Sequence, residues 1–251
     1  MKLILLGTAG YHPTNERQTM CSMLPELGVV FDAGTGMFRV RDHLQTPTLD
    51  ILLSHAHLDH VVGLSFLLNV LRGDDLEMRA MRHVRVHGAA EKLDAIRRHL
   101  FSEHLFPVMP PIEWCPLKQP MTVGEGTSIT WFPLPHPGGS IGYRLDWSDR
   151  SMAYVTDTTA HADADYIQRI HGVDLLVHEC TLPDGWEQRA EQIGHSCIGQ
   201  VARLARAANV GKLILVHLNA LVPIQEVPDV ARARALFPKM QLAVDQLEVV
   251  F

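Results

Sequence analysis

The sequence predicts an α/β fold in a single domain over residues 1–251, built as a sandwich with helices on its outer faces. In each half of the chain, short apolar runs typical of strands are followed by segments typical of helices, and no low-complexity linker divides the halves. The length of 251 residues is also sufficient to bury a substantial core. We expect the chemistry in loops at one edge of this sandwich.

The first half begins with three apolar strands, each of which leads into small or polar residues. These are Lys2 to Leu6, Val29 to Asp32 and Leu49 to Leu53. The segment His60 to Arg72 is apolar almost all round, which predicts a buried helix. Residues 82–101 then read as one βα unit, with a strand in RHVRVHG and an amphipathic helix in AAEKLDAIRRHLF.

The second half opens with an irregular, proline-rich stretch, Pro107 to Pro120. Residues 121–156 alternate strand-like runs with turns, which favours a meander. Further βα units follow, with a strand at Val173 to Val177, a helix from about Ser196 to Ala208 and a strand at Lys212 to Val216. The chain ends on one strand-like run, LAVDQLEVVF.

The composition is that of an ordinary globular protein, with 47% hydrophobic and 20% charged residues. No apolar run approaches the roughly 18 residues of a membrane span, so we expect a cytoplasmic protein without a membrane partner. A net charge of -6 argues against a surface coated in positive charge for nucleic acid. The four cysteines form no CxxC pair and predict neither a thiolate metal site nor a disulfide framework: Cys21, Cys115, Cys180 and Cys197.

The segment SHAHLDH, residues 54–60, carries the strongest functional signal. It places three imidazoles and a carboxylate between an apolar strand and an apolar helix: His55, His57, Asp59 and His60. Imidazole and carboxylate together suit zinc, iron or manganese. In so tight a loop, His55 and His57 can point to one metal ion while Asp59 and His60 point to a second.

This HxHxDH pattern resembles the metallo-β-lactamase superfamily, and the resemblance extends over nearly the whole chain. In order and context, His136 in PLPHPGG, Asp157 in AYVTDTT and His217 in LILVHLN match the family's remaining ligands. The resemblance implies a four-layer αββα sandwich with two divalent metal ions, most simply zinc, with manganese and iron as alternatives. It assigns His55, His57 and His136 to one metal, Asp59, His60 and His217 to the other, and Asp157 to a bridge between them.

A narrower resemblance concerns the C-terminal third. The stretches HPGGSIGYRL, DLLVHECT and GHSCIGQVARLARAANVGKLILVH are similar to the ribonuclease Z branch. The resemblance implies that His195 contacts the scissile phosphate, where an imidazolium could neutralise charge or protonate the leaving oxygen. His195 and Asp59 are therefore the predicted catalytic residues.

The expected reaction is hydrolysis of a phosphodiester. Two metals about 3.5 to 4 Å apart can share a hydroxide that attacks phosphorus. The charge of two divalent ions, offset by two aspartates and one hydroxide, leaves a net charge of about +1 at the site. This net charge favours an anionic substrate. Only residues 137–156 separate His136 from Asp157, too few for the arm that grips transfer RNA in ribonuclease Z of the short form. The leading hypothesis is therefore a small or cyclic phosphodiester, with RNA as a further possible partner.

Three other functions stay open. They are transfer RNA 3′ processing by a ribonuclease Z, hydrolysis of a thioester or lactone on the same fold, and a non-hydrolytic, metal-stabilised binding protein. All of the expected metal ligands are present in the sequence, which argues against the non-hydrolytic binding protein. The sequence also leaves open a homodimer and the roles of His12, His178 and Glu179.

Overall fold

The computed structural model describes residues 1–73, 75, 77–79, 81–124, 126–221 and 229–251. The chain forms two compact units, each with its own sheet and core. The first comprises Met1–Lys118 with Val244–Val250, and the second comprises Gln119–Ala243 with Phe251. The organisation of residues 1–251 as a single domain stays a prediction.

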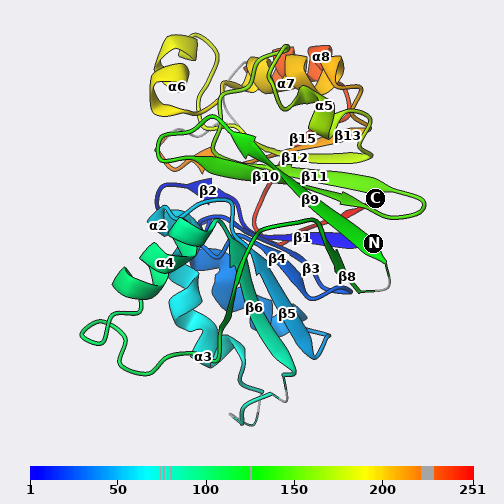
Figure 1. Cartoon of the computed structure of the whole chain (residues 1–251). Helices are drawn as coiled ribbons and strands as arrows, with labels where there is room; N and C mark the ends of the chain where they lie inside the picture. The colour runs from blue at the N-terminus through cyan, green and yellow to red at the C-terminus, as the bar shows by residue number, and fades with distance from the viewer. Residues whose placement is uncertain (74, 76, 80, 125, 222–228) are drawn as a thin grey trace. The chain divides into compact units, whose positions relative to one another are not determined.

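The first unit is built, within its described residues, on a seven-stranded sheet in the order β16-β1-β3-β4-β5-β6-β7 (Figure 1). Strands β4, β5, β6 and β7 pair in parallel. Because parallel strands end at the same edge, the loops that follow β4 and β5 meet there. The strands are β1 (Lys2–Gly7), β3 (Cys21–Leu24), β4 (Val29–Phe31), β5 (Thr48–Leu52), β6 (His83–Gly88), β7 (Glu113–Pro116) and β16 (Leu247–Val250).

The helices of the first unit are short, except for α4. The predicted buried helix from His60 to Arg72 is divided into three pieces, because the amide of Gly63 donates to Ala33 O over 2.7 Å instead of continuing the helix. A Cβ atom on Gly63 would stand 2.1 Å from Gly34 O, so this contact requires glycine. The helices are α1 (Val40–His43), α2 (Leu58–Val61), α3 (Leu67–Val70) and α4 (Ala90–His99), with 3₁₀ helices at Thr35–Arg39 and Val62–Phe66; a short strand β2 lies at Ala9–Gly10.

The second unit holds another seven-stranded sheet in its described part, in the order β15-β13-β12-β11-β10-β9-β8 (Figure 1). The predicted meander is its antiparallel half, from β8 to β11. Its other strands pair in parallel. The strands are β8 (Met121–Val123), β9 (Thr127–Leu134), β10 (Ser140–Asp146), β11 (Ser151–Val155), β12 (Leu175–Glu179), β13 (Lys212–Val216) and β15 (Met240–Leu242), and a short β14 lies at Leu218–Asn219.

Helices α5, α7 and α8 cover one face of the second sheet (Figure 1). Helix α7 begins with a capping box, in which the amide of Cys197 donates to Gln200 Oε1 over 2.9 Å. Ser196, where the sequence predicted the helix to begin, lies just outside it: its hydroxyl donates to Thr158 O over 2.7 Å and accepts from the amide of Ala160. The helices are α5 (Ile167–Ile170), α6 (Glu187–Ile193), α7 (Ile198–Ala207) and α8 (Asp229–Leu236).

Two further predictions differ from the structure. The stretch Pro107 to Pro120, expected to be irregular, contains the edge strand β7, which β6 pairs in parallel. The terminal run LAVDQLEVVF is not one strand, because β15 ends at Leu242 in the second unit and β16 begins at Leu247 in the first. Asp245 interrupts it by accepting hydrogen bonds from Thr8 Oγ1 and the Gln18 amide. None of the helices among the described residues is long and apolar enough to cross a membrane.

Candidate metal centre

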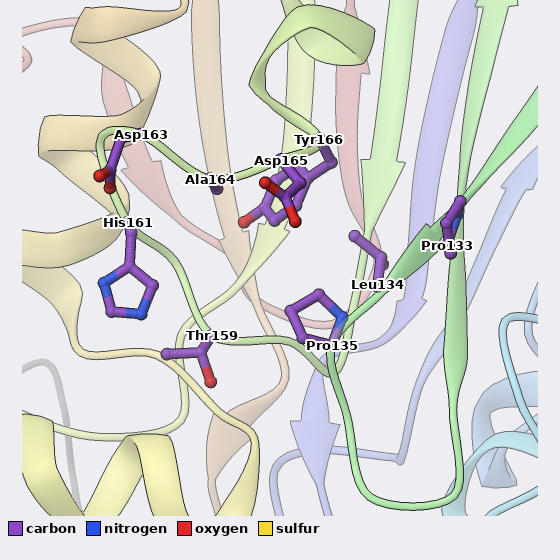
Figure 2. Close-up of a pocket in the computed structure, with 9 residues that line it drawn as sticks. All are labelled: Pro133, Leu134, Pro135, Thr159, His161, Asp163, Ala164, Asp165 and Tyr166. Carbon is purple, nitrogen blue, oxygen red and sulfur yellow. The ribbon is translucent and has the colours of Figure 1, made fainter.

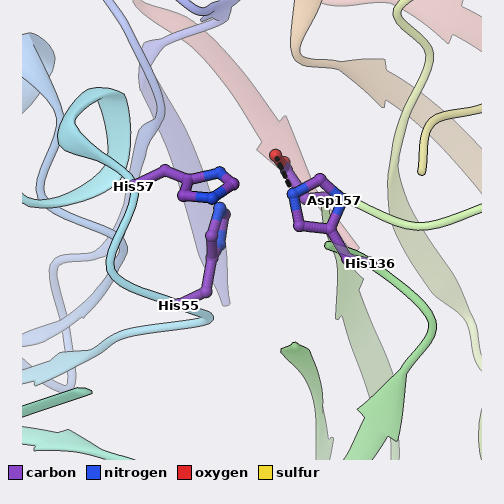
Figure 3. Close-up of side chains that lie close together, drawn as sticks. All are labelled: His55, His57, His136 and Asp157. Carbon is purple, nitrogen blue, oxygen red and sulfur yellow. Dashed lines mark ion pairs between the residues drawn. The ribbon is translucent and has the colours of Figure 1, made fainter. Parts of the chain in front are cut away.

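The four candidate ligands of the first unit follow β5: His55 and His57 lie in the loop, and Asp59 and His60 lie in helix α2. The rings of His55 and His57 meet edge to face with centroids 4.4 Å apart (Figure 3), and those of His55 and His60 lie 4.3 Å apart. Asp59 accepts a hydrogen bond from the amide of Tyr11 over 2.8 Å, with Tyr11 in the left-handed region at φ 68°. The structure therefore brings these four side chains together between the end of β5 and the end of α2.

Asp32, which follows β4, holds this loop in place. Its buried carboxylate accepts hydrogen bonds from the amide and hydroxyl of Ser54, and lies 2.9 Å from His60 Nδ1. Because the hydroxyl of Ser54 donates to Asp32, it accepts from His55 Nδ1 at 2.9 Å. Both histidines thus have Nδ1 bound by protein oxygen, as metal-binding imidazoles usually do.

The second unit brings together the other four candidates. Asp157 Oδ1 lies 3.3 Å from His217 Nε2, and Asp157 Oδ2 lies 3.6 Å from His136 Nε2, the ion pair dashed in Figure 3. Asp157, His195 and His217 lie close enough together to hold a metal ion. Asp157 and His217 both adopt the left-handed region, at φ 51° and 53°. Such strain in residues other than glycine is characteristic of functional sites.

The histidines of the second unit are oriented in the same way as those of the first. His136 Nδ1 donates to Gly194 O over 2.8 Å, and His217 Nδ1 lies 2.9 Å from Thr181 Oγ1. Gly194 allows this approach, since a Cβ atom there would stand 2.3 Å from Pro137 Cδ. In four of the predicted ligands Nδ1 is therefore engaged with protein oxygen, so a metal would be bound through Nε2. This donor set fits zinc, iron or manganese.

His195 has an acidic neighbour in Glu179, which is fully buried. Nδ1 of His195 lies 3.7 Å from Glu179 Oε1, and Thr181 donates to Glu179 Oε2 through its amide and hydroxyl. Burial acts to raise the pKa of Glu179, but the interaction with His195 and the charges of nearby histidines hold that pKa below its usual value. Glu179 is therefore an anion that can stabilise a protonated His195.

His178, whose role the sequence leaves open, does not face His195. Its Nδ1 donates to Glu179 O over 2.8 Å, so its Nε2 accepts from the hydroxyl of Tyr166 at 3.0 Å. Burial lowers the pKa of His178 and raises that of Tyr166 well above its ordinary value. Both side chains are therefore neutral at pH 7. Nδ1 of His12 lies 2.9 Å from Pro13 O, and this contact assigns no role to His12.

Sequence reasoning missed the residues that orient the ligands. These are Asp32, Ser54, Thr181 and Gly194. For Asp32 a signal existed, because it is a carboxylate at the end of an apolar strand, where burial demands a partner. Ser54 is adjacent to His55, but its other partner, Asp32, is distant in sequence. Thr181 and Gly194 are likewise distant from the ligands that they contact, so only the structure identifies these contacts.

The comparisons with known proteins identify the family of the chain. The family model described as "Beta-lactamase superfamily domain" matches residues 28–218. Ribonuclease Z from Bradyrhizobium sp. (strain ORS 278) is 27% identical over 304 residues, with 97% of each chain covered. Because 304 exceeds the 251 residues of this chain by 53, that relative has insertions that are absent here.

Solved structures show the fold. Human tRNase Z, short form, has a TM-score of 0.78 and 19% identity over 100% of this chain and 99% of its own. A diphosphatase from the PhnP family has a TM-score of 0.73 and 18% identity over 100% and 97%. These matches confirm the predicted αββα fold class and the predicted class of enzyme, and the chain belongs to the metallo-β-lactamase superfamily, as a ribonuclease Z-like hydrolase.

Proposed function

We propose that this protein is a two-metal phosphodiesterase. In this proposal His55, His57 and His136 bind one metal, Asp59, His60 and His217 bind the other, and Asp157 bridges them. The observation that carries it is the shared Nδ1 arrangement of four of these histidines, two in each unit. Such support fixes the ring tautomer, raises ligand basicity and leaves Nε2 of each ring as the nitrogen that would bind a metal.

Two divalent cations, with zinc as the first choice, would supply a water of lowered pKa and a clamp for a phosphoryl oxygen. The residues of the chain then have defined tasks. Asp59 is held by the Tyr11 amide and Asp157 lies between His136 and His217, so both carboxylates are fixed before substrate arrives. A net charge of about +1 at the loaded site favours an anionic diester over a neutral amide.

His195 is assigned the proton transfer to the leaving oxygen. Its side chain is 15% exposed, so substrate can reach the ring, and the buried Glu179 beside it favours the protonated form. His195 donates its proton as the phosphorus–oxygen bond breaks, and Glu179 keeps the ring oriented.

A small diester is the substrate we favour. Between His136 and Asp157 the chain forms only β10, β11 and their tight turns, with the Trp147 amide donating to Arg150 O over 2.9 Å. Basic side chains outside this hairpin are interleaved with acidic ones, as Arg98 is with Asp94, rather than aligned as a track for RNA. The cytoplasmic location and a homodimer stay predictions.

Processing of transfer RNA is the second candidate, because the Bradyrhizobium relative and the human structure are named for that enzyme. Salt separates the two candidates. A polyanion held by many Lys and Arg loses affinity steeply with salt, whereas a small diester does not.

The test combines metal analysis with hydrolysis. The purified protein should hold about two transition-metal ions per chain and hydrolyse bis(p-nitrophenyl) phosphate with little change between 50 and 200 mM salt. Efficient, strongly salt-dependent cleavage of precursor transfer RNA would favour the second candidate. Hydrolysis of thioesters or lactones, but not of phosphodiesters, would assign that other reaction to this protein. Bound metal without any hydrolysis would contradict the enzyme proposal and favour a metal-stabilised binding protein.

A further inference from the structure

The two candidate carboxylate ligands are supported in different ways. Asp157 is held from within its own loop, because the hydroxyl of the adjacent Thr156 donates to Asp157 Oδ1 over 2.7 Å. Ser196 fixes the same loop, which Figure 2 shows from Thr159 to Tyr166. Asp59 instead accepts from the amide of Tyr11, which lies 48 positions away in the sequence. The support of Asp59 is therefore only as firm as the segment that carries Tyr11.

That segment, the Thr8–Gln18 loop, closes on itself at its base. The amides of Thr8 and Ala9 both donate to Gln18 O, each over 2.9 Å. Tyr11 lies between these ends in the left-handed region at φ 68°, which a residue other than glycine keeps only where surrounding contacts hold it. Because the side chain of Tyr11 is 83% exposed, its own packing supplies little of this support. The conformation at Tyr11 thus depends on how the base of the loop is fixed.

A single carboxylate fixes both ends of the Thr8–Gln18 loop. Asp245, which lies between β15 and β16, accepts hydrogen bonds from the hydroxyl of Thr8 and the amide of Gln18, each over 2.7 Å. Its side chain is 5% exposed and forms an ion pair with Arg39. A buried carboxylate is costly unless it is paired and hydrogen-bonded, and these donors meet that requirement. All of these residues belong to the first unit.

We propose that Asp245 is a positioning residue of the metal centre. By fixing both ends of the Thr8–Gln18 loop, it holds the Tyr11 amide against Asp59 and so orients the Asp59 carboxylate. The inference rests on the proposed function and adds a residue outside the ligand set. Among the described residues, the hydrogen bonds of Asp245 go to the two loop ends and to Arg39, none of which is a candidate ligand. Its effect on Asp59 therefore passes through the loop.

Metal affinity gives the first test, measured as competition for Zn²⁺ with a chromogenic chelator. Asp245→Ala should weaken binding by roughly tenfold, the lower end of the range for a residue that supports a ligand. Asp245→Asn should recover part of the loss, because its carboxamide oxygen still accepts from one end of the loop. Unchanged affinity in a folded Asp245→Ala protein would overturn the proposal.

Asp50→Ala is the matched control. Asp50 is another buried, ion-paired carboxylate of the first unit, and its side chain is bound by Arg85 and His87 rather than by the loop. Its removal should lower stability and leave metal affinity unchanged. An equal loss of affinity in both alanine variants would reduce the effect of Asp245 to general destabilisation and overturn the proposal.

Variants of Tyr11 test the route through the loop. Tyr11→Pro removes the amide donor and should weaken metal binding at least as much as Asp245→Ala. The double variant should bind metal no more weakly than Tyr11→Pro alone, because both changes remove the same contact. Tyr11→Gly keeps the amide and accepts a positive φ, so it should bind metal like wild type. Additive losses in the double variant would show that Asp245 acts by another route.

Hydrogen exchange of the Tyr11 amide in metal-free protein separates this inference from the proposed function. Asp245→Ala should speed this exchange and Asp50→Ala should not, because an exposed loop exchanges by local opening rather than by global unfolding. If the protein binds no metal while exchange changes in this way, Asp245 does orient Asp59 and the two-metal proposal fails. Exchange at the wild-type rate in Asp245→Ala would overturn the role of Asp245 whether or not metal binds.

Discussion

The hydroxyl of Thr181 lies 2.9 Å from Nδ1 of His217. The same oxygen lies 3.0 Å from Glu179 Oε2 and 3.4 Å from His195 Nδ1. Because the Glu179 carboxylate only accepts, the hydroxyl of Thr181 donates to it and accepts a hydrogen bond from His217 Nδ1. One threonine thus fixes the tautomer of a candidate ligand and connects it to the carboxylate beside His195.

Thr181→Val should therefore weaken metal binding, because it keeps the shape of the side chain but removes the acceptor of His217. A loss of 10- to 100-fold in affinity is usual for such a partner, and competition with a chromogenic chelator measures it without reference to activity. Thr181→Ser should recover most of the loss. Wild-type metal affinity in the valine variant would show that Thr181 does not position His217.

Asp157→Ala should lose at least one of about two metal ions and nearly all activity. In the proposed site the Asp157 carboxylate would be shared by both ions and would neutralise part of their charge, so its removal would leave positive charge uncompensated. Elemental analysis after dialysis gives the metal content. Two ions retained at full occupancy would rule out the bridge.

His195→Ala should keep both ions while kcat falls by about 10² to 10⁴, the range for a positioned general acid. The loss should be smaller for a p-nitrophenolate leaving group than for an alkoxide, since a stable anion needs little protonation as it leaves. Glu179→Gln should show the same dependence on leaving group. A lost metal ion would instead make His195 a ligand, consistent with its closeness to Asp157 and His217.

Asp50→Asn should lower the free energy of unfolding at pH 7 by about 2 to 3 kcal/mol. The carboxylate of Asp50 is buried against Arg85 and His87, each 2.7 Å away. Burial raises its pKa, but these two partners outweigh burial and hold the pKa below its usual value.

The pH dependence of this effect has a defined sign. A depressed folded pKa gives stability that is present above the unfolded pKa of about 3.9 and lost as pH falls through the folded value. The difference between wild type and Asp50→Asn, measured by urea unfolding, should therefore vanish in that acid window. The exposed pair of Asp94 and Arg98 provides the control, because Asp94→Asn should change stability by under about 1 kcal/mol. An equal effect of both variants would contradict the argument.

The sequence by itself determined the local features of this protein. His55, His57, Asp59 and His60 lie close together because six residues cannot spread them apart, and apolar runs placed six of the strands (β1, β4, β5, β6, β12 and β13) within two residues of their observed ends. Periodicity and spacing act over one element, so they can be read along the chain. Family motifs extended this reading to His136, Asp157, His195 and His217.

Only the tertiary structure decided which groups support these residues. Ser54 meets Asp32, Gly194 meets His136 and Thr181 meets His217 across 22, 58 and 36 positions of sequence. The division of the terminal run between β15 and β16 was likewise decided by packing. Hydrogen bonds of this kind depend on which strand ends share a sheet edge, and that follows from the order of the strands in each sheet, which local sequence does not encode.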